Sequence, residues 1–349
     1  MISSFPVKVF ATRGSDVLAR EVCKELRRRL PPGLQPGGSL TLAEHEVREM
    51  DNENILVQLE ESVRGHFVVI IDTHAPPVHT RFFELLHLSD AIIHAGPAEI
   101  LSVFPYFEYC RSDKKDQPRI STMSVLLAGI WNEGFRINKK LILDLHDQHV
   151  KHYFRPAADE ISAMYLWVDY LDRELFTPDP GRKEKSVVAF ADAGSFTRYR
   201  NIPHVLNLPS AYLNKQRIGG KTKIHSVVGE VKDKHCLLLD DEICSGGTAE
   251  DDARELLDRG ARSVMVLAIH GILSSKKMSR TDLIKKLDES EVVDRFIITN
   301  SVHLPEELKD AKKFVVLSVA PLLAEAISRI VLNLSLTELH QPEKVALYR

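Results

Sequence analysis

The stretch CLLLDDEICSGGTAEDD, residues 236–252, joins an apolar run to a pair of carboxylates and then to a glycine turn. The four residues before Asp240 are apolar or thiol side chains, which is typical of a buried parallel strand. In doubly wound α/β sheets, ligands bind outside the carboxyl ends of the strands. Asp240 and Asp241 are therefore expected at a ligand-binding edge of a sheet.

The turn Ser245-Gly246-Gly247-Thr248 is predicted to start a helix. Its glycines leave backbone N–H groups unobstructed, and its two hydroxyls add donors at the positive end of the helix dipole, which suits a phosphate. The two carboxylates before it suit the vicinal hydroxyls of a sugar. The residues thus favour a ribose 5-phosphate site. The alternative interpretation is a capped helix start with acidic residues at its favourable end.

The rest of the chain alternates apolar runs with helical patterns. VKVFA precedes SDVLAREVCKELRRRL, HFVVIID precedes TRFFELLHLSDAII, and HCLLLDD precedes TAEDDARELLDRGA. This alternation predicts an α/β fold with mainly parallel sheets. A chain of 349 residues with 44% apolar content is long enough for two domains. We expect them at 1–160 and 161–319, with a helix near 320–332 that packs back on the first.

Composition argues against several classes of partner. The net charge is −3, and acidic and basic residues are interspersed without a basic tract, so neither nucleic acid nor a membrane surface is expected to bind. The sequence shows no apolar stretch long enough to span a bilayer and no signal-peptide pattern at its start, which indicates a cytoplasmic protein. The four cysteines lack metal-ligand spacing and are expected to be free thiols.

Residues 236–252 resemble the ribose-phosphate loop of phosphoribosyltransferases and of ribose-phosphate pyrophosphokinases, the PRPP synthetases. Only the second family is similar along nearly the whole chain, because ESVRGHFVVIIDT, VFPYFEYCRSDKKDQPRIS, LILDLHDQH, AFADAG and PLLAEAISRI each resemble one of its motifs in the expected order. The resemblance implies two similar phosphoribosyltransferase-like, Rossmann-like domains. Each is expected to be a mainly parallel sheet flanked by helices.

The resemblance also implies a nucleotide site in the first domain. Arg111, Ser112 and Asp116 in RSDKKD match the family's nucleotide segment, where an arginine can reach a triphosphate. Asn52 and Asn54 in MDNEN stand in the segment that approaches the adenine of a neighbouring subunit. A homo-oligomer, either a dimer or a hexamer, is therefore expected. A solvated charged loop is the alternative interpretation of RSDKKD.

Metal-binding and catalytic positions follow from the same resemblance. His146 in DLHDQH and Asp192 in FADAG correspond to the positions that hold Mg²⁺, an ion that takes few protein ligands. Lys215 and Arg217 in YLNKQRIGGKTK match the family's catalytic lysine and arginine on a mobile loop. A hydrogen-bonded structural histidine and a basic surface loop are the alternative interpretations.

The implied activity is that of a ribose-phosphate diphosphokinase, which makes PRPP and AMP from ATP and ribose 5-phosphate with Mg²⁺. Two alternatives stay open. Diphosphoryl transfer to a different ribosyl acceptor is suggested by Cys244, where the commonest synthetases have an aspartate, and by a Ser-Gly-Gly-Thr turn that resembles the plant-type branch. A regulatory subunit without turnover is the other, although the predicted catalytic and binding residues are all present.

Overall fold

The computed structural model divides the chain into two compact units. The first comprises Met1–Ser162, Ser301–His303 and Val319–Arg349, and the second comprises Ala163–Asn300 and Leu304–Ser318. For some residues, 216–218 and 221–225, only the backbone is described. The structure describes residues 5–73, 76–115, 118–218, 221–342 and 344.

The first unit is built on a five-stranded sheet in the order β1-β4-β5-β6-β7, with every neighbouring pair parallel. All five residues of β4 are buried, as expected for a parallel strand that is covered on both faces. The strands are β1 Val7–Ala11, β4 Phe67–Ile71, β5 Glu99–Phe104, β6 Lys139–Leu143 and β7 Asp159–Ile161.

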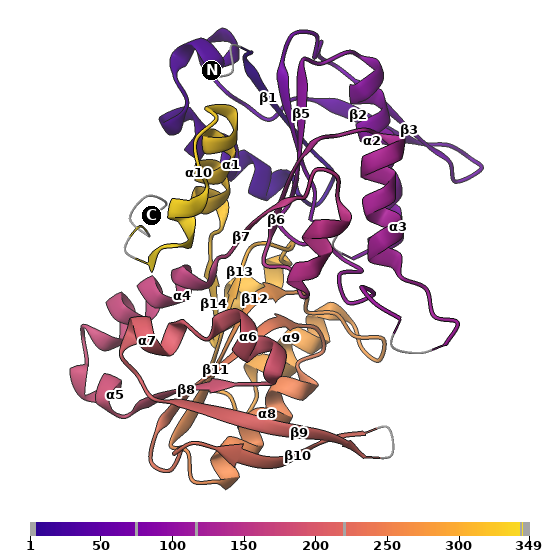
Figure 1. The fold of residues 1–349 in the computed structure, drawn as a ribbon. Helices are drawn as coiled ribbons and strands as arrows, with labels where there is room; N and C mark the ends of the chain where they lie inside the picture. The colour runs from indigo at the N-terminus through magenta and orange to yellow at the C-terminus, as the bar shows by residue number, and fades with distance from the viewer. Residues whose placement is uncertain (1–4, 74–75, 116–117, 219–220, 343, 345–349) are drawn as a thin grey trace. The chain divides into compact units, whose positions relative to one another are not determined.

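A separate antiparallel hairpin and several helices complete this unit. The C-terminal helix α10 packs against α1, and an ion pair of 3.3 Å joins Arg29 Nε to Glu325 Oε2 (Figure 1). The hairpin strands are β2 His45–Glu49 and β3 Ile55–Leu59. The α-helices are α1 Asp16–Arg29, α2 Val78–His94, α3 Met123–Gly129 and α10 Ala320–Val331. Shorter helical segments are η1 Pro32–Leu34, η2 Pro36–Gly38, η3 Ile130–Gly134, η4 Gln148–Tyr153 and η7 Thr337–His340.

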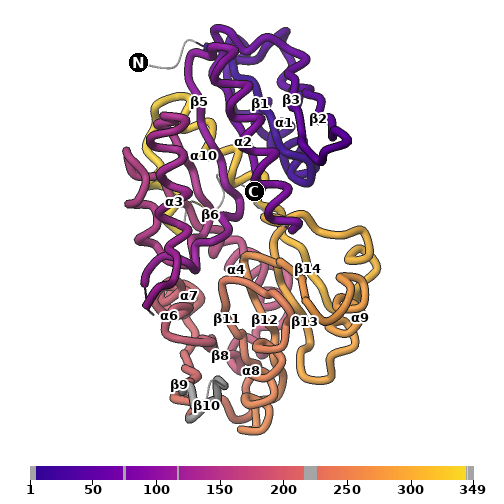
Figure 2. The backbone as a smooth tube through the Cα atoms, turned by 90° about the vertical axis from the view of Figure 1, so that its right-hand side faces the viewer, coloured from indigo at the N-terminus to yellow at the C-terminus, as the bar shows by residue number. Residues whose placement is uncertain are grey.

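The second unit is built on a seven-stranded sheet in the order β10-β9-β8-β11-β12-β13-β14. Only the edge pair β9–β10 is antiparallel; the other pairs are parallel. Figure 2 shows β11, β12 and β13 side by side, with β11 at the middle of the strand order. The strands are β8 Ser186–Phe190, β9 Ser210–Ile218, β10 Lys221–Val228, β11 His235–Ile243, β12 Ser263–Gly271, β13 Arg295–Thr299 and β14 Phe314–Leu317.

Helices of the second unit cover this sheet with their apolar faces. Ala249, Ala253 and Leu256 of α8 join residues of β8, β11 and β12 in one buried cluster. The α-helices are α4 Met164–Tyr170, α5 Pro180–Glu184, α6 Ala193–Tyr199, α7 Ile202–Leu206, α8 Gly247–Asp258 and α9 Arg280–Asp288. Shorter segments are η5 Leu171–Phe176 and η6 Glu306–Asp310. The predicted α/β fold with mainly parallel sheets is confirmed in both units.

Candidate functional site

The paired aspartates lie near the carboxyl end of β11, at the centre of the second sheet. The side chain of Asp241 is only 4% exposed, and its Oδ1 lies 3.0 Å from Nη2 of Arg198 on α6. Asp240 is half-buried, and its Oδ1 accepts a hydrogen bond of 2.9 Å from the backbone N–H of Asp241. One carboxylate of the pair is therefore neutralised by a guanidinium within the same unit.

Asp240 stands in an electrostatically unfavourable place for a carboxylate. Burial raises its pKa well above the ordinary value, and the neighbouring Asp241 and the charge of Asp192 raise it further. A group in that state is stabilised by hydroxyl donors or by a cation, because either reduces the repulsion between the carboxylates. The end of β11 is thus suited to a ligand that supplies O–H groups or positive charge.

The glycine turn after β11 starts α8, as the sequence predicts. Gly246 adopts φ +73°, and a Cβ built on it would lie 2.4 Å from Cδ2 of Leu287, so this position needs glycine for two independent reasons. Gly247 is the first residue of the twelve-residue helix, and Ser245 and Thr248 are exposed. The turn therefore presents its hydroxyls to solvent at the N-terminus of α8.

Asp192 caps the helix α6 that follows β8. Its Oδ1 accepts a hydrogen bond of 2.8 Å from the backbone N–H of Ser195, and the hydroxyl of Ser195 accepts one of 3.0 Å from the N–H of Asp192, which together form a capping box. The side chain is exposed, and its charge acts on Asp240 and Asp252. This predicted metal ligand therefore also fixes the start of a helix.

Lys215 does not lie in an open loop, which corrects the sequence interpretation. It belongs to β9, which forms a hairpin with β10, because residues on the two strands pair in antiparallel register. Its Nζ lies 2.6 Å from Oδ2 of Asp252 on α8. The backbone of Arg217 lies on the same strand, but its side chain, like Gly219 and Gly220, falls outside the described residues.

Two of the residues predicted to bind the nucleotide, Arg111 and Ser112, lie on the connection that follows β5. Arg111 is exposed after β5, while Ser112 donates a hydrogen bond of 3.0 Å to the carbonyl of Ser121 and accepts one of 3.0 Å from the N–H of Met123. Ser112 therefore closes the base of its loop. Asp116 falls outside the described residues.

Asn52 and Asn54 occupy the tip of the β2–β3 hairpin. Both are exposed, and Oδ1 of Asn52 accepts a hydrogen bond of 3.2 Å from the N–H of Asn54. The N–H of Met50 donates to the carbonyl of Asn54 at 2.8 Å, which closes the turn. The tip is thus ordered by its own local hydrogen bonds, and both asparagine side chains are accessible.

The two predicted metal ligands belong to different units. His146 is half-buried and follows β6 in the first unit, whereas Asp192 follows β8 in the second. Among the described residues, no group of three or more His, Cys, Asp or Glu side chains is arranged to hold a metal ion. A magnesium ion keeps several waters and phosphate oxygens and takes one or two protein carboxylates, and the exposed carboxylate of Asp192 is a group of that kind.

Two charged residues of the second unit were missed by the sequence reasoning. Arg198, which pairs with Asp241, lies on α6, six residues after the Asp192 cap. No pattern in the sequence around it marks it as the partner of a buried carboxylate. Asp252 carries a clearer signal, because it occupies the buried face of α8 with Ala249, Ala253 and Leu256. A carboxylate in an apolar helical stripe predicts a buried cationic partner.

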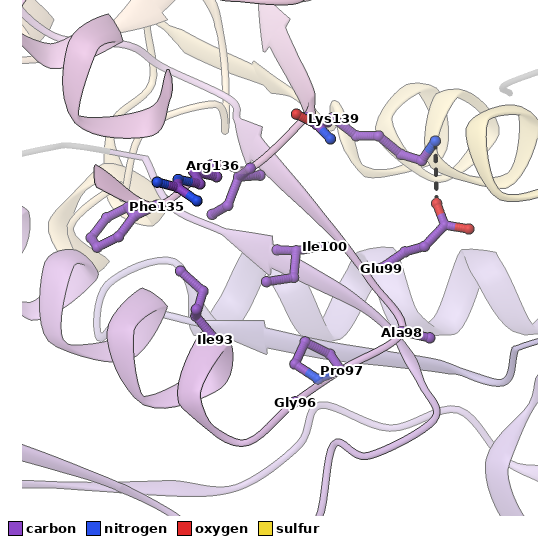
Figure 3. Close-up of a pocket in the computed structure, with 11 residues that line it drawn as sticks. Ile93, Gly96, Pro97, Ala98, Glu99, Ile100, Phe135, Arg136 and Lys139 are labelled. Carbon is purple, nitrogen blue, oxygen red and sulfur yellow. Dashed lines mark ion pairs between the residues drawn. The ribbon is translucent and has the colours of Figure 1, made fainter. Parts of the chain in front are cut away.

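A pocket of the first unit lies at the amino ends of two strands of its sheet, away from Arg111 and His146. It has a volume of about 330 Å³ and forms where β5 and β6 begin, whereas Arg111 and His146 follow the ends of these strands. Figure 3 shows the ion pair between Lys139 and Glu99 at this pocket, 3.2 Å long. None of the predicted site residues lines it.

The second unit is an α/β domain in which the paired aspartates and the glycine turn lie at the carboxyl end of a central strand, where doubly wound α/β proteins bind ligands. Two family models match the chain: the N-terminal domain of ribose phosphate pyrophosphokinase at residues 7–132, and the phosphoribosyl synthetase-associated domain at residues 190–341. In the part of the chain that the structure describes, no helix is long and apolar enough to cross a membrane.

Similar proteins cover nearly the whole chain. The ribose-phosphate pyrophosphokinase of Caldanaerobacter subterraneus is 33% identical over 335 residues, which are 95% of this chain and 97% of that protein. That of Campylobacter jejuni is 30% identical over 333 residues, 95% of this chain and 98% of the relative. The crystal structure of phosphoribosylpyrophosphate synthetase from Mycobacterium smegmatis matches with a TM-score of 0.80 and 28% identity, over 94% of this chain and 99% of that one. The chain belongs to the ribose-phosphate pyrophosphokinase family.

Proposed function

We propose that this chain is a ribose-phosphate diphosphokinase. It transfers the β,γ-diphosphoryl group of ATP to the 1-hydroxyl of ribose 5-phosphate and gives PRPP and AMP. The anomeric oxygen attacks the β-phosphorus, the bond from that phosphorus to the oxygen of the α-phosphate breaks, and the hydroxyl proton is released. Membership of the family and coverage of nearly the full length of its members support this activity.

The proposal rests mainly on the two aspartates near the end of β11 and on the glycine turn that follows them. Asp240 has a pKa raised by burial and by its carboxylate neighbours, so ribose hydroxyls that donate hydrogen bonds to it would stabilise its ionised form. The turn from Ser245 to Thr248 follows at the N-terminus of α8, where exposed hydroxyls and backbone N–H groups suit the 5-phosphate. One segment thus supplies partners for both ends of the acceptor.

Phosphoryl transfer is accelerated mainly by positioning and by positive charge at the transferred group. Lys215 and Arg217 are the cations that we assign to this role. Asn52, Asn54, Arg111, Ser112 and Asp116 are assigned to the nucleotide. The family uses a divalent metal ion, and we propose Mg²⁺, held by His146 and Asp192, which would neutralise part of the triphosphate charge.

A direct assay tests the proposal. Purified protein is incubated with ATP, Mg²⁺ and ribose 5-phosphate, and AMP and PRPP are followed by mass spectrometry. We expect both products in equal amounts. AMP formed only with another ribosyl acceptor would reject the acceptor but keep the reaction class, and no AMP with any acceptor would favour a regulatory subunit.

The assembly is also a proposal. In the family's pattern, the segment matched by Asn52 and Asn54 approaches the nucleotide of a neighbouring subunit, so a homo-oligomer is expected to be the active form. A concentration series followed by light scattering and by activity tests this, because a monomer that retains full turnover would contradict it. The cytoplasmic location stays a prediction.

A further inference from the structure

The ion pair between Lys215 and Asp252 joins two elements at the carboxyl side of the second sheet. Lys215 Nζ and Asp252 Oδ2 lie 2.6 Å apart, and the two side chains are 14% and 2% exposed. Strand β9 pairs with β8 only as far as Tyr212 opposite Phe190, so Lys215 lies three residues beyond the last paired position. The lysine therefore extends past the carboxyl end of β8.

Asp252 is almost completely buried, which is energetically unfavourable for an ionised carboxylate. It shares the buried face of α8 with Ala249, Ala253 and Leu256, and burying an ionised group is unfavourable unless a partner is present. Burial raises its pKa to about 6, while the Lys215 ammonium lowers it. The carboxylates of Asp192 and Asp251 raise the pKa as well. Lys215 is thus the cation in direct contact that favours the ionised form.

Other elements packed against α8 bring further charged groups to the same part of the unit. Strands β10, β11 and β12 pack against α8, β9 contacts it through Lys215, and Lys286 of α9 forms an ion pair with Glu250 of α8. Along β11 and β12 the titratable residues toward the carboxyl ends are Asp240, Asp241, Glu242 and His270. Asp241 forms its ion pair with Arg198, and Asp252 forms its ion pair with Lys215.

We propose that Asp252 is a positioning residue for the catalytic lysine: through its contact with Lys215 it holds the ammonium group at the carboxyl side of the second sheet. This role rests on the proposed function. A lysine side chain has four flexible carbon–carbon torsions and loses considerable entropy when it is fixed. A buried anion on a helix that is itself packed in the core fixes the ammonium before the donor phosphates arrive, which reduces the entropy lost during the reaction.

A double-mutant cycle tests whether Asp252 acts through Lys215. We expect Asp252→Asn, which keeps the shape and removes the charge, to lower kcat about tenfold while KM for ribose 5-phosphate changes less than about twofold. In a Lys215→Ala background the same substitution is expected to have no further effect on kcat, because the group that it positions is gone. Asp251→Asn is the matched control, since it removes an equal charge from the adjacent, exposed residue.

The pH dependence gives a second readout that a purely structural role would not change. Asp252 is ionised above its pKa of about 6 and loses its hold on Lys215 when it is protonated below that value. The ratio of wild-type kcat to Asp252→Asn kcat is therefore expected to fall toward one between pH 7.5 and pH 5. Titration of the substrate phosphates affects both proteins equally and cancels in this ratio.

The experiments distinguish a failure of the positioning role from a failure of the proposed function. An active wild type with an unaffected Asp252→Asn variant would overturn the positioning role alone, as would equal losses in the wild-type and Lys215→Ala backgrounds or a ratio that stays constant with pH. A wild type that forms no AMP with any acceptor would overturn the proposed function and this role with it. Thermal unfolding followed by circular dichroism identifies any variant whose loss comes from misfolding.

Discussion

The end of β11 and the tip of the β2–β3 hairpin are both assigned to substrates, yet the protein holds them in different ways. Asp241 is almost completely buried and paired with Arg198, and Asp240 has a pKa raised by burial and by its neighbours. Asn52 and Asn54 are exposed, and the hydrogen bond from the N–H of Asn54 to Oδ1 of Asn52 lies within the turn that carries them.

This difference separates two kinds of binding residue. Buried charges are costly, so those at the end of β11 are held by partners in the same unit, and substitutions there are expected to change both stability and activity. Exposed amides at a hairpin tip contribute little to folding, so substitutions there are expected to change activity alone.

The largest effect is expected from Lys215→Ala. Removing a cation that stabilises charge at the transferred phosphoryl group is expected to lower turnover by about a thousandfold. Binding of ribose 5-phosphate, measured by isothermal titration calorimetry, should be nearly unchanged. Turnover close to the wild-type value would remove this lysine from the mechanism.

Arg198→Ala is expected to destabilise the second unit, because it leaves Asp241 buried without its cation. Breaking a buried ion pair on one side costs about 3 kcal/mol of unfolding free energy, which urea denaturation can measure. Arg200→Ala is the control, since Arg200 is exposed two residues further along. Equal denaturation midpoints for the two variants would mean that Asp241 does not depend on this guanidinium.

Asp240→Asn is expected to lower the affinity for ribose 5-phosphate about tenfold, which is the effect of losing one hydrogen bond to a charged group. The same substitution is expected to increase the free energy of unfolding near neutral pH, because the amide replaces a carboxylate whose pKa is raised by burial. The folded wild type takes up a proton more readily than the unfolded chain, so its stability relative to the variant should rise as pH falls through the raised pKa. Unchanged acceptor affinity would separate this carboxylate from the sugar.

The smallest effect is expected from Asn52→Ala. Loss of one neutral hydrogen bond should raise KM for the nucleotide about threefold, with the thermal unfolding midpoint unchanged. Asp51→Ala, at the neighbouring exposed position, controls for any change in the turn. A clear fall in the unfolding midpoint for Asn52→Ala would contradict the contrast between the two regions.

Local patterns in the sequence determined the central elements of the second unit. The apolar run before Asp240 became β11, and the turn with Gly246 became the start of α8, because burial of apolar side chains and a left-handed backbone position are encoded by neighbouring residues. The order of successive motifs along the chain also indicates the family without reference to the fold.

Only the tertiary structure decided which charges meet. Lys215 and Asp252 are 37 residues apart in the chain, and they pair because β9 continues past the end of β8 while α8 turns its buried face toward the sheet. The same holds for Arg198 and Asp241, on α6 and β11. A sequence pattern reports the preferences of adjacent residues, whereas an ion pair between distant elements depends on sheet order and helix packing, which no local pattern contains.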